Sequence, residues 1–217
     1  MITIKINGTK HRIPTEWVDV TYSQYVSLLS TLNTLPAYIA LFTGIDQKRI
    51  ESSELKNLET IAIALSFITI PPKIEPKPTR LVGPYVVPAD VTLQSLGQFE
   101  DLRGVLQRLP QKKETIEENQ LVADLYLEAC AIYCQKIKHG SYDYSKVSEV
   151  KEELKSYSCI EVIQTGGFFL FKLVNLSTPI RTRSLSIRQR LKKLIQDFPG
   201  YQKTLDSLQR SLESRGK

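Results

Sequence analysis

The residues best suited to chemistry are three cysteines and two histidines, His11 and His139. Cys130 and Cys134 lie four residues apart, so they would share one helix face and could form part of a metal site. Alanine and isoleucine surround them, and a metal site usually needs further ligands close by, so we interpret both as small core residues. The odd third cysteine, Cys159, favours a reducing compartment over a disulfide framework. Both histidines are expected at the surface.

Two further motifs have a chemical and a structural interpretation. Gly166-Gly167 could present free amides to a phosphate, but such a loop usually follows a strand, and none is predicted before it. Close packing between helices explains the glycines more simply. Asp143, between two tyrosines, fits a turn and helix start better than a catalytic acid. The sequence has no glycine-rich phosphate loop, paired-histidine motif or Cys-x-x-Cys, so it predicts no enzyme, metal site or cofactor.

The positive charge is concentrated at the C-terminal end. The formal net charge is +6, and residues 181–217 contain ten Lys and Arg against three acidic residues, which leaves −1 for the rest. Apolar stripes starting at Ile187 and Tyr201 predict two basic amphipathic helices. The candidate partner-binding residues in this segment are Arg188, Arg190, Lys192 and Lys193. A solvated helix face, an acidic protein partner and the phosphates of nucleic acid would each explain the pattern.

The N-terminal residues predict a hairpin followed by a capped helix. Strands at 2–6 and 9–13 flank Asn7-Gly8, a pair that takes the positive φ angles of a type I′ turn. Thr21 stands three residues before Gln24, the spacing of a capping box, and would open an amphipathic helix of about three turns. The candidate partner-binding residues here are Trp17 and Tyr25, as anchors of that helix. Core packing alone is the simpler alternative for both.

Helical spacing continues through most of the remaining chain. Further helices are predicted at 36–43, from a cap at Ser52 or Ser53 to Phe67, and at 93–109, 121–138, 145–156 and 159–176. The last of these, capped by Ser158, is the most apolar, but Glu161 and Lys172 within it indicate a buried helix rather than a membrane span. Six prolines between residues 71 and 88 predict an extended arm or a long hairpin.

These elements define the expected fold class and organisation. The chain is predicted to be α+β and predominantly α-helical, with an N-terminal β-hairpin (1–13) and a short proline-rich β-arm (69–88) in a body spanning 1–178. Residues 179–217 would add the basic amphipathic C-terminal helices. Secretion is not expected, because residues 2–6 alternate polar and apolar side chains and are unlike a signal peptide.

The tripeptide Asp-Val-Thr occurs at 19–21 and again at 90–92, each time after a proline-marked extended segment and before a predicted helix. Only the first copy has the Thr-x-x-Gln spacing of a capping box, and the likeness of the two regions fades within about two turns. We interpret the repeat as a shared way of entering a helix rather than as a duplicated domain.

Three segments resemble structural and assembly proteins of tailed bacteriophages, particularly those of crAss-like and other Bacteroidetes phages. The matching residues of the first segment are Ile13, Pro14, Trp17, Asp19, Thr21, Gln24 and Tyr25. Those of the second are Pro88, Asp90, Thr92, Leu96, Gly97, Gln98, Phe99 and Leu102. Those of the third are Ala131, Ile132, Tyr133, Gly140, Tyr142, Asp143, Tyr144, Gly166, Phe168, Phe169, Leu170 and Leu173. The resemblance spans most of residues 13–176 and includes no catalytic motif.

The resemblance implies a non-enzymatic virion structural protein that works by contact, as a subunit of a portal-to-tail ring, collar or tail connector. Its partners would be copies of itself, in a homo-oligomeric ring, and other virion proteins, with no membrane. It would be made in the host cytoplasm and located in the tail or collar region of the virion. A tail assembly chaperone that is absent from the mature virion is one alternative. A nucleic-acid-binding protein that uses the basic tail from Arg181 is another.

Overall fold

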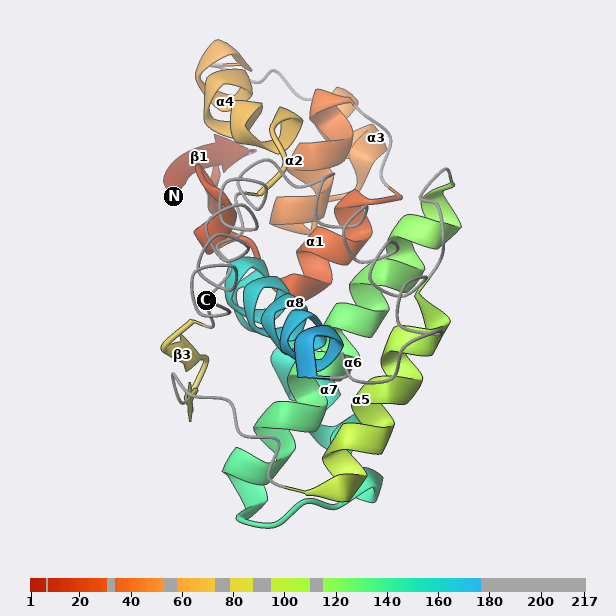
Figure 1. The fold of residues 1–217 in the computed structure, drawn as a ribbon. Helices are drawn as coiled ribbons and strands as arrows, with labels where there is room; N and C mark the ends of the chain where they lie inside the picture. The colour runs from red at the N-terminus through yellow and green to blue at the C-terminus, as the bar shows by residue number, and fades with distance from the viewer. Residues whose placement is uncertain are drawn as a thin grey trace, which may run out of the picture.

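The computed structural model describes residues 1–6, 8–30, 34–52, 58–72, 79–87, 95–109 and 115–176. It is mainly helical with an N-terminal two-stranded hairpin, which confirms the predicted α+β class. Figure 1 shows the hairpin and four short helices at one end and a bundle of longer helices at the other. The second Asp-Val-Thr and the predicted C-terminal helices lie outside the described residues.

The N-terminal hairpin forms as its turn residues predict. β1 (Ile2–Ile6) pairs antiparallel with β2 (Thr9–Ile13), and Ile6 faces Thr9 across a two-residue loop. Gly8 has a φ of 82°, a left-handed conformation that glycine adopts without steric cost. Ile6 and Ile13 are buried, so alternate side chains of the hairpin turn toward the helices.

A capping box opens the first helix, as predicted. The 3-10 helix η1 (Trp17–Asp19) leads into α1 (Tyr22–Leu28). The Thr21 hydroxyl accepts a hydrogen bond from the Gln24 amide, and the Gln24 side chain accepts one from the Thr21 amide. α1 has seven residues, about two turns rather than three, because the Leu29 amide turns to the Val26 carbonyl and ends the α-helical pattern.

Two short helices follow, and one of them was not predicted. α2 (Leu35–Thr43) has Pro36 in its first turn and ends at Gly44, whose φ is 70°, as the sequence indicates. The unpredicted helix is α3 (Gln47–Glu51), which Asp46 caps. Ser52 ends α3, so the prediction that Ser52 caps the next helix is wrong, and Ser53 lies outside the described residues.

The outermost helix of this end is α4 (Leu58–Leu65), continued by the 3-10 helix η2 (Ser66–Thr69). Ile61 and Leu65 are buried, as their spacing predicts. Ala62, the residue next to Ile61 in the chain, is exposed.

The described part of the proline-rich segment is a small hairpin packed on the bundle. β3 (Leu81–Val82) pairs with β4 (Tyr85–Val86) around Gly83-Pro84. Val82 and Tyr85 are buried, and β3 contacts α8 while β4 contacts α6. Gly83 has a φ of 53°, and a Cβ there would lie 2.6 Å from the ring of Tyr157. Only glycine therefore allows this turn to lie so close to the bundle.

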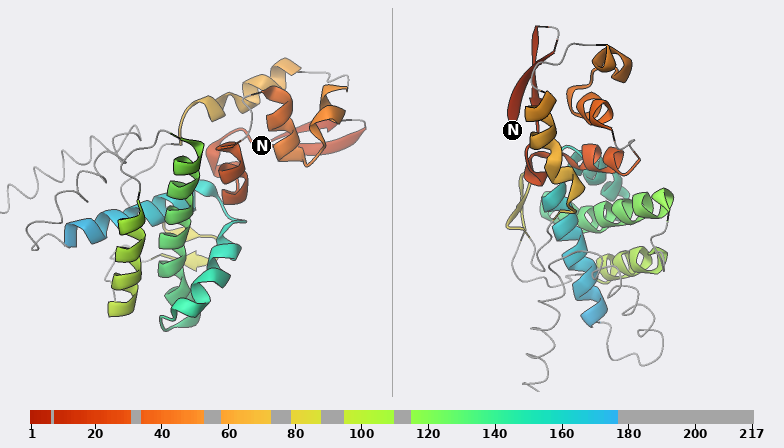
Figure 2. Two further views of the ribbon diagram at one scale, coloured as in Figure 1. Left: turned by 90° about the vertical axis from the view of Figure 1, so that its right-hand side faces the viewer. Right: turned by 90° about the horizontal axis from the view of Figure 1, so that it is seen from above.

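Four helices form the bundle, with α6 at its centre (Figures 1 and 2). They are α5 (Leu96–Arg108), α6 (Ile116–His139), α7 (Val147–Leu154) and α8 (Cys159–Leu176), with the 3-10 helix η3 (Tyr144–Lys146) before α7. Residues 125–135 of α6 are buried throughout, because α5, α7 and α8 each contact that helix. None of the described helices is long and apolar enough to cross a membrane.

Three predicted features of the bundle are corrected. α6 begins at Ile116 rather than near residue 121, because Thr115 and Glu118 form a second capping box before the predicted start. Leu96 fits the apolar spacing of α5, yet it stands in the first turn of that helix and is 77% exposed. The Ser158 hydroxyl has no hydrogen-bond partner and does not cap α8; the residue instead forms a β-bridge with Thr21.

α8 and α6 cross closely at a glycine. A Cβ on Gly166 would clash with the backbone carbonyl of Tyr126, so the two helices approach nearer than any larger residue allows. This confirms helix packing as the role of that glycine. Nearby, the ring of Tyr133 stacks on Phe169 with centroids 3.6 Å apart.

Candidate partner-binding site

An aromatic cluster lies where the N-terminal segment meets η2. Trp17 packs edge-on against Tyr25 of α1, with ring centroids 6.0 Å apart, and against Phe67 of η2 at 5.2 Å. Its indole Nε1 donates to the carbonyl oxygen of Ile70 at 2.9 Å. The two predicted residues are therefore brought together, and Phe67 is a third member that local spacing did not reveal. All three rings are partly buried against the core, an arrangement typical of aromatic packing.

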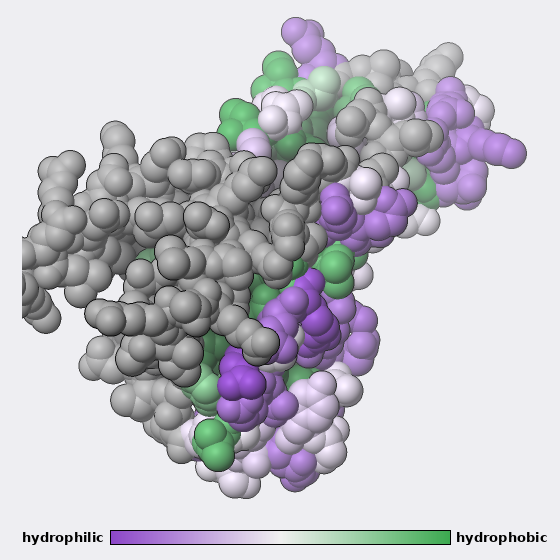
Figure 3. All heavy atoms as spheres, turned by 45° about the vertical axis from the view of Figure 1, so that its right-hand side comes forward, coloured by the Kyte–Doolittle hydropathy of each residue, from purple (hydrophilic) through white to green (hydrophobic). Residues whose placement is uncertain are grey.

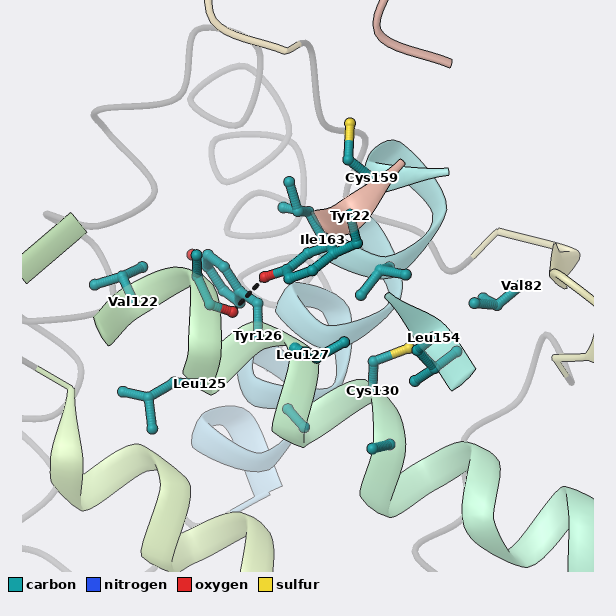
Figure 4. Packing of buried hydrophobic residues seen from close by; sticks show 14 of the residues in the cluster. Tyr22, Val82, Val122, Leu125, Tyr126, Leu127, Cys130, Leu154, Cys159 and Ile163 are labelled. Carbon is teal, nitrogen blue, oxygen red and sulfur yellow. Dashed lines mark hydrogen bonds between the residues drawn. The ribbon is translucent and has the colours of Figure 1, made fainter. Parts of the chain in front are cut away.

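The residues beside this cluster tie the N-terminal segment to the bundle. The Tyr22 amide donates to the Tyr157 carbonyl at 2.8 Å, and the Cys159 amide donates to the Val20 carbonyl at 2.8 Å. The Tyr22 hydroxyl donates to the carbonyl of Ala123 in α6. Figure 4 shows the Tyr22 ring reaching in among residues of α6 and α8. Burial raises the pKa of Tyr22 well above its ordinary value, so the hydroxyl stays protonated and remains a donor.

The chain start is fastened to the same region. The Met1 amino group lies 2.9 Å from the Asp19 carboxylate and also donates to the Thr15 hydroxyl at 2.9 Å. Burial alone would raise the pKa of Asp19, but the hydrogen bonds from Met1 and Thr15 outweigh it and lower that pKa. The first aspartate of Asp-Val-Thr is thus a charged anchor for the beginning of β1.

A second polar centre, missed by sequence reasoning, surrounds Glu153 of α7. Its carboxylate accepts hydrogen bonds from Tyr85 at 2.8 Å, Tyr157 at 3.0 Å and Lys138 at 2.8 Å. The Lys138 ammonium also bonds Glu149 at 2.7 Å. We call Lys138, Glu149, Glu153 and the two tyrosines the Glu153 network. Glu149, Glu153 and Tyr157 follow helical spacing, but nothing local in the sequence links them to Tyr85 or Lys138.

The pKa shifts in the Glu153 network keep its groups in one protonation state at neutral pH. The hydrogen bond from Lys138 lowers the pKa of Glu153, and the bonds from Tyr85 and Tyr157 add to that effect. Burial and the bond to Glu153 raise the pKa of Tyr85. The carboxylate therefore stays ionised and the phenol stays protonated at neutral pH, so the network pins the β3–β4 hairpin to the bundle.

The cysteines have the structural role that the sequence indicates. All three are buried and free, and the sulfur atoms of Cys130 and Cys134 are 4.0 Å apart. Burial raises the pKa of Cys130 and raises that of Cys159 to about 12, which keeps both as thiols and makes them poor nucleophiles. Within the described ranges, no group of three or more His, Cys, Asp or Glu is placed to hold a metal ion.

The histidines differ slightly from the predicted surface positions. His11 is half-buried, on the helix-facing side of β2. The Nε2 atom of His139 is buried without a hydrogen-bond partner and lies 3.9 Å from a Glu149 carboxylate oxygen. Among the described residues, neither histidine belongs to a cluster of reactive side chains.

Hydrogen bonds from three residues, Gln135, Tyr142 and Asp143, fix the loop after α6. The Gln135 side chain donates to the Ser141 carbonyl and accepts from the Asp143 amide. The Tyr142 hydroxyl donates to Asp101 of α5 at 2.6 Å. Asp143 accepts from the Ser145 amide and opens η3, so its predicted role as a turn and helix-start residue is confirmed.

Apolar side chains are exposed at both ends of the molecule (Figure 3). Beside the aromatic cluster, Val18 is 52% exposed and Ile70 is 67% exposed. Leu96, at the start of α5, and Tyr144, at the start of η3, are also exposed. The two segments meet where Gly97 lies against the ring of Tyr142.

The other predicted partner-binding residues, Arg188, Arg190, Lys192 and Lys193, lie outside the described residues. The described residues form a set of contacts that fix the fold, and exposed apolar side chains lie on several elements. A comparison of the chain with protein-family models, curated proteins and solved structures found no match.

Proposed function

We propose that the chain is a non-enzymatic structural protein of a tailed-phage virion, a subunit of a ring, collar or connector in the portal-to-tail region. In this proposal it forms a homo-oligomeric ring and contacts other virion proteins. The observation that carries the proposal is that the residues resembling phage proteins are those that build this fold.

Each described group of matching residues has a packing or capping role. Thr21 and Gln24 form the capping box of α1. Tyr142 and Asp143 fix the loop between α6 and α7. Gly166 permits the close approach of α6 and α8. A resemblance carried by such residues supports a shared scaffold, and a scaffold protein acts through its shape and its surface.

The exposed apolar areas suit a ring. A closed ring of identical subunits needs two different surfaces on each subunit, because neighbours meet head to tail. Val18 and Ile70 lie beside the aromatic cluster, whereas Leu96 begins α5 and Tyr144 begins η3. In the proposed ring, exposed apolar side chains on different elements would supply the contact with each neighbour.

Mass spectrometry of purified particles, from a culture infected by the phage that encodes the chain, tests the proposal. The chain should copurify with the virion through a density gradient and remain after a wash in high salt. Abundance in the lysate together with loss from particles would instead identify a tail assembly chaperone.

The nucleic-acid alternative has a separate test. Deletion of residues 181–217 should leave incorporation into particles intact if the described body makes the ring contacts. If the deletion abolishes DNA binding and incorporation together, the basic tail carries the function, and the ring proposal is wrong in its assignment of the contact surface.

A further inference from the structure

The β1–β2 hairpin presents a basic face to solvent. Lys5, Lys10 and Arg12 are exposed on the side of the hairpin opposite the buried Ile6 and Ile13. We call these three cations the basic hairpin face. In Figure 2 (left) the hairpin lies at the edge of the molecule, with β1 pointing away from the bundle, so this face is reached without passing over other described elements.

The basic hairpin face concentrates charge that the fold leaves unbalanced. Lys5 stands directly opposite Lys10 in the strand register, and like charges in facing positions destabilise a β-ladder. Within the described part of the chain, none of the three cations has a carboxylate within ion-pair distance. The nearby ammonium of Met1, in contrast, is paired with Asp19. Repulsion between the lysines would be relieved by an external anion.

The composition of this face favours a nucleic acid over a protein partner. Interfaces between proteins centre on apolar and aromatic side chains and are depleted in lysine, whereas interfaces with DNA are strongly positive. The remaining residue on this face of the paired strands is the small polar Thr3, opposite Arg12. Lys10 and Arg12 point the same way about 6.8 Å apart along the strand, which suits successive contacts to a charged backbone.

We propose that the basic hairpin face binds the phosphate backbone of nucleic acid without sequence specificity. The three cations neutralise phosphates, and no aromatic side chain on this face is available to stack on bases. This site is separate from the C-terminal tail, and it does not depend on the ring proposal. Its failure would leave that proposal untouched.

Salt-dependent binding of the full chain to a labelled 30-base-pair DNA duplex tests this site. The variant K5Q/K10Q/R12Q removes the three cations and keeps polar side chains that a strand tolerates. A matched control, R80Q/R103Q/K146Q, removes three exposed cations from the bundle end. Fluorescence anisotropy from low to moderate salt gives the slope of log K against log salt concentration for each protein. Circular dichroism and thermal melting verify that each variant is folded.

The hairpin variant should reduce the steepness of the slope by about 2.7, since each neutralised phosphate contributes about 0.9. The control should change the slope by less than one. Equal slopes for the two variants would overturn the proposal and leave the lysines as protection of the strand edges against aggregation. A greater loss of binding to poly-glutamate than to the duplex would also overturn it, in favour of an acidic protein partner.

Discussion

The crossing of α6 and α8 and the junction between the N-terminal segment and the bundle hold the molecule together in different ways. At the crossing, Gly166 lies against the backbone of Tyr126, and buried rings close over the contact. At the junction, backbone hydrogen bonds, one buried hydroxyl and partly buried aromatic rings make the connection. The crossing depends on the absence of one methyl group, whereas the junction depends on several polar contacts that each contribute modestly.

This difference predicts which part of the protein unfolds first. Loss of the crossing removes the centre of the core, so it should unfold the whole molecule. Loss of junction contacts should let the hairpin and short helices open while the bundle persists.

Gly166→Ala should destabilise the protein by about 3 kcal/mol, because the added methyl group meets a backbone carbonyl that cannot move without shifting a buried helix. Gly104→Ala in α5 is the matched control. A Cβ there meets nothing within 4 Å, so the same change should stabilise by about 0.5–1 kcal/mol. Chemical denaturation measures both, and effects of the same sign would contradict the close crossing.

Tyr22→Phe should cost about 1–2 kcal/mol, because it removes the buried hydrogen bond to the Ala123 carbonyl while keeping the ring. Hydrogen exchange should show faster opening of β1, β2 and α1 than of α6. Tyr144→Phe removes an equivalent hydroxyl from a residue that is 56% exposed, and should change stability by less than about 0.5 kcal/mol. Uniform acceleration across the whole chain would show that the junction does not open separately.

Thr21→Ala should cost about 1 kcal/mol, because it breaks a capping box at the junction. Thr115→Ala breaks the same kind of box at the exposed start of α6, and should cost about half as much. Comparison of urea midpoints for the two variants isolates the contribution of position from that of the motif. A larger loss of stability for Thr115→Ala than for Thr21→Ala would contradict the expectation that the start of α1 matters more than the start of α6.

Glu153→Gln should have a small effect, roughly 0.5–1 kcal/mol at pH 7, because the carboxylate is partly exposed to solvent. The folded state lowers the pKa of Glu153, so its contribution is present above the ordinary glutamate pKa and is lost as pH falls through the lower folded value. The variant should therefore lose less stability than the parent on acidification below about pH 4.5. Glu152→Gln, at a more exposed carboxylate, should retain the parental pH dependence.

Turn, cap and helix-boundary residues in the sequence predicted the local structure around them. Asn7-Gly8 gave the hairpin register, the Thr21 and Gln24 spacing gave the cap of α1, and Pro36 with Gly44 bounded α2. Each of these features depends on residues within one or two turns of each other. α3 was not predicted, because its five residues are too few to show a helical period.

Contacts between distant residues were beyond sequence reasoning. The glycine at 166 indicated close packing, but nothing in the pattern named Tyr126 as its neighbour. The ring of Phe67 packs against Trp17, about fifty residues away in the chain, and Lys138 of α6 donates a hydrogen bond to Glu153 of α7. Such pairs follow from how whole elements pack. Leu96 has the helical spacing of the buried residues of α5, yet its side chain is exposed, which the spacing alone does not reveal.

The copy number in particles tests the proposal that this chain is a built-in subunit of a virion ring. Quantitative mass spectrometry of gradient-purified particles, with isotope-labelled peptides from the described body as standards, measures its copy number relative to the other virion proteins. A built-in subunit should be present in several copies per particle, and its ratio to the other virion proteins should be the same in independent preparations. Absence from particles, or a ratio that varies with the stringency of washing, would contradict it.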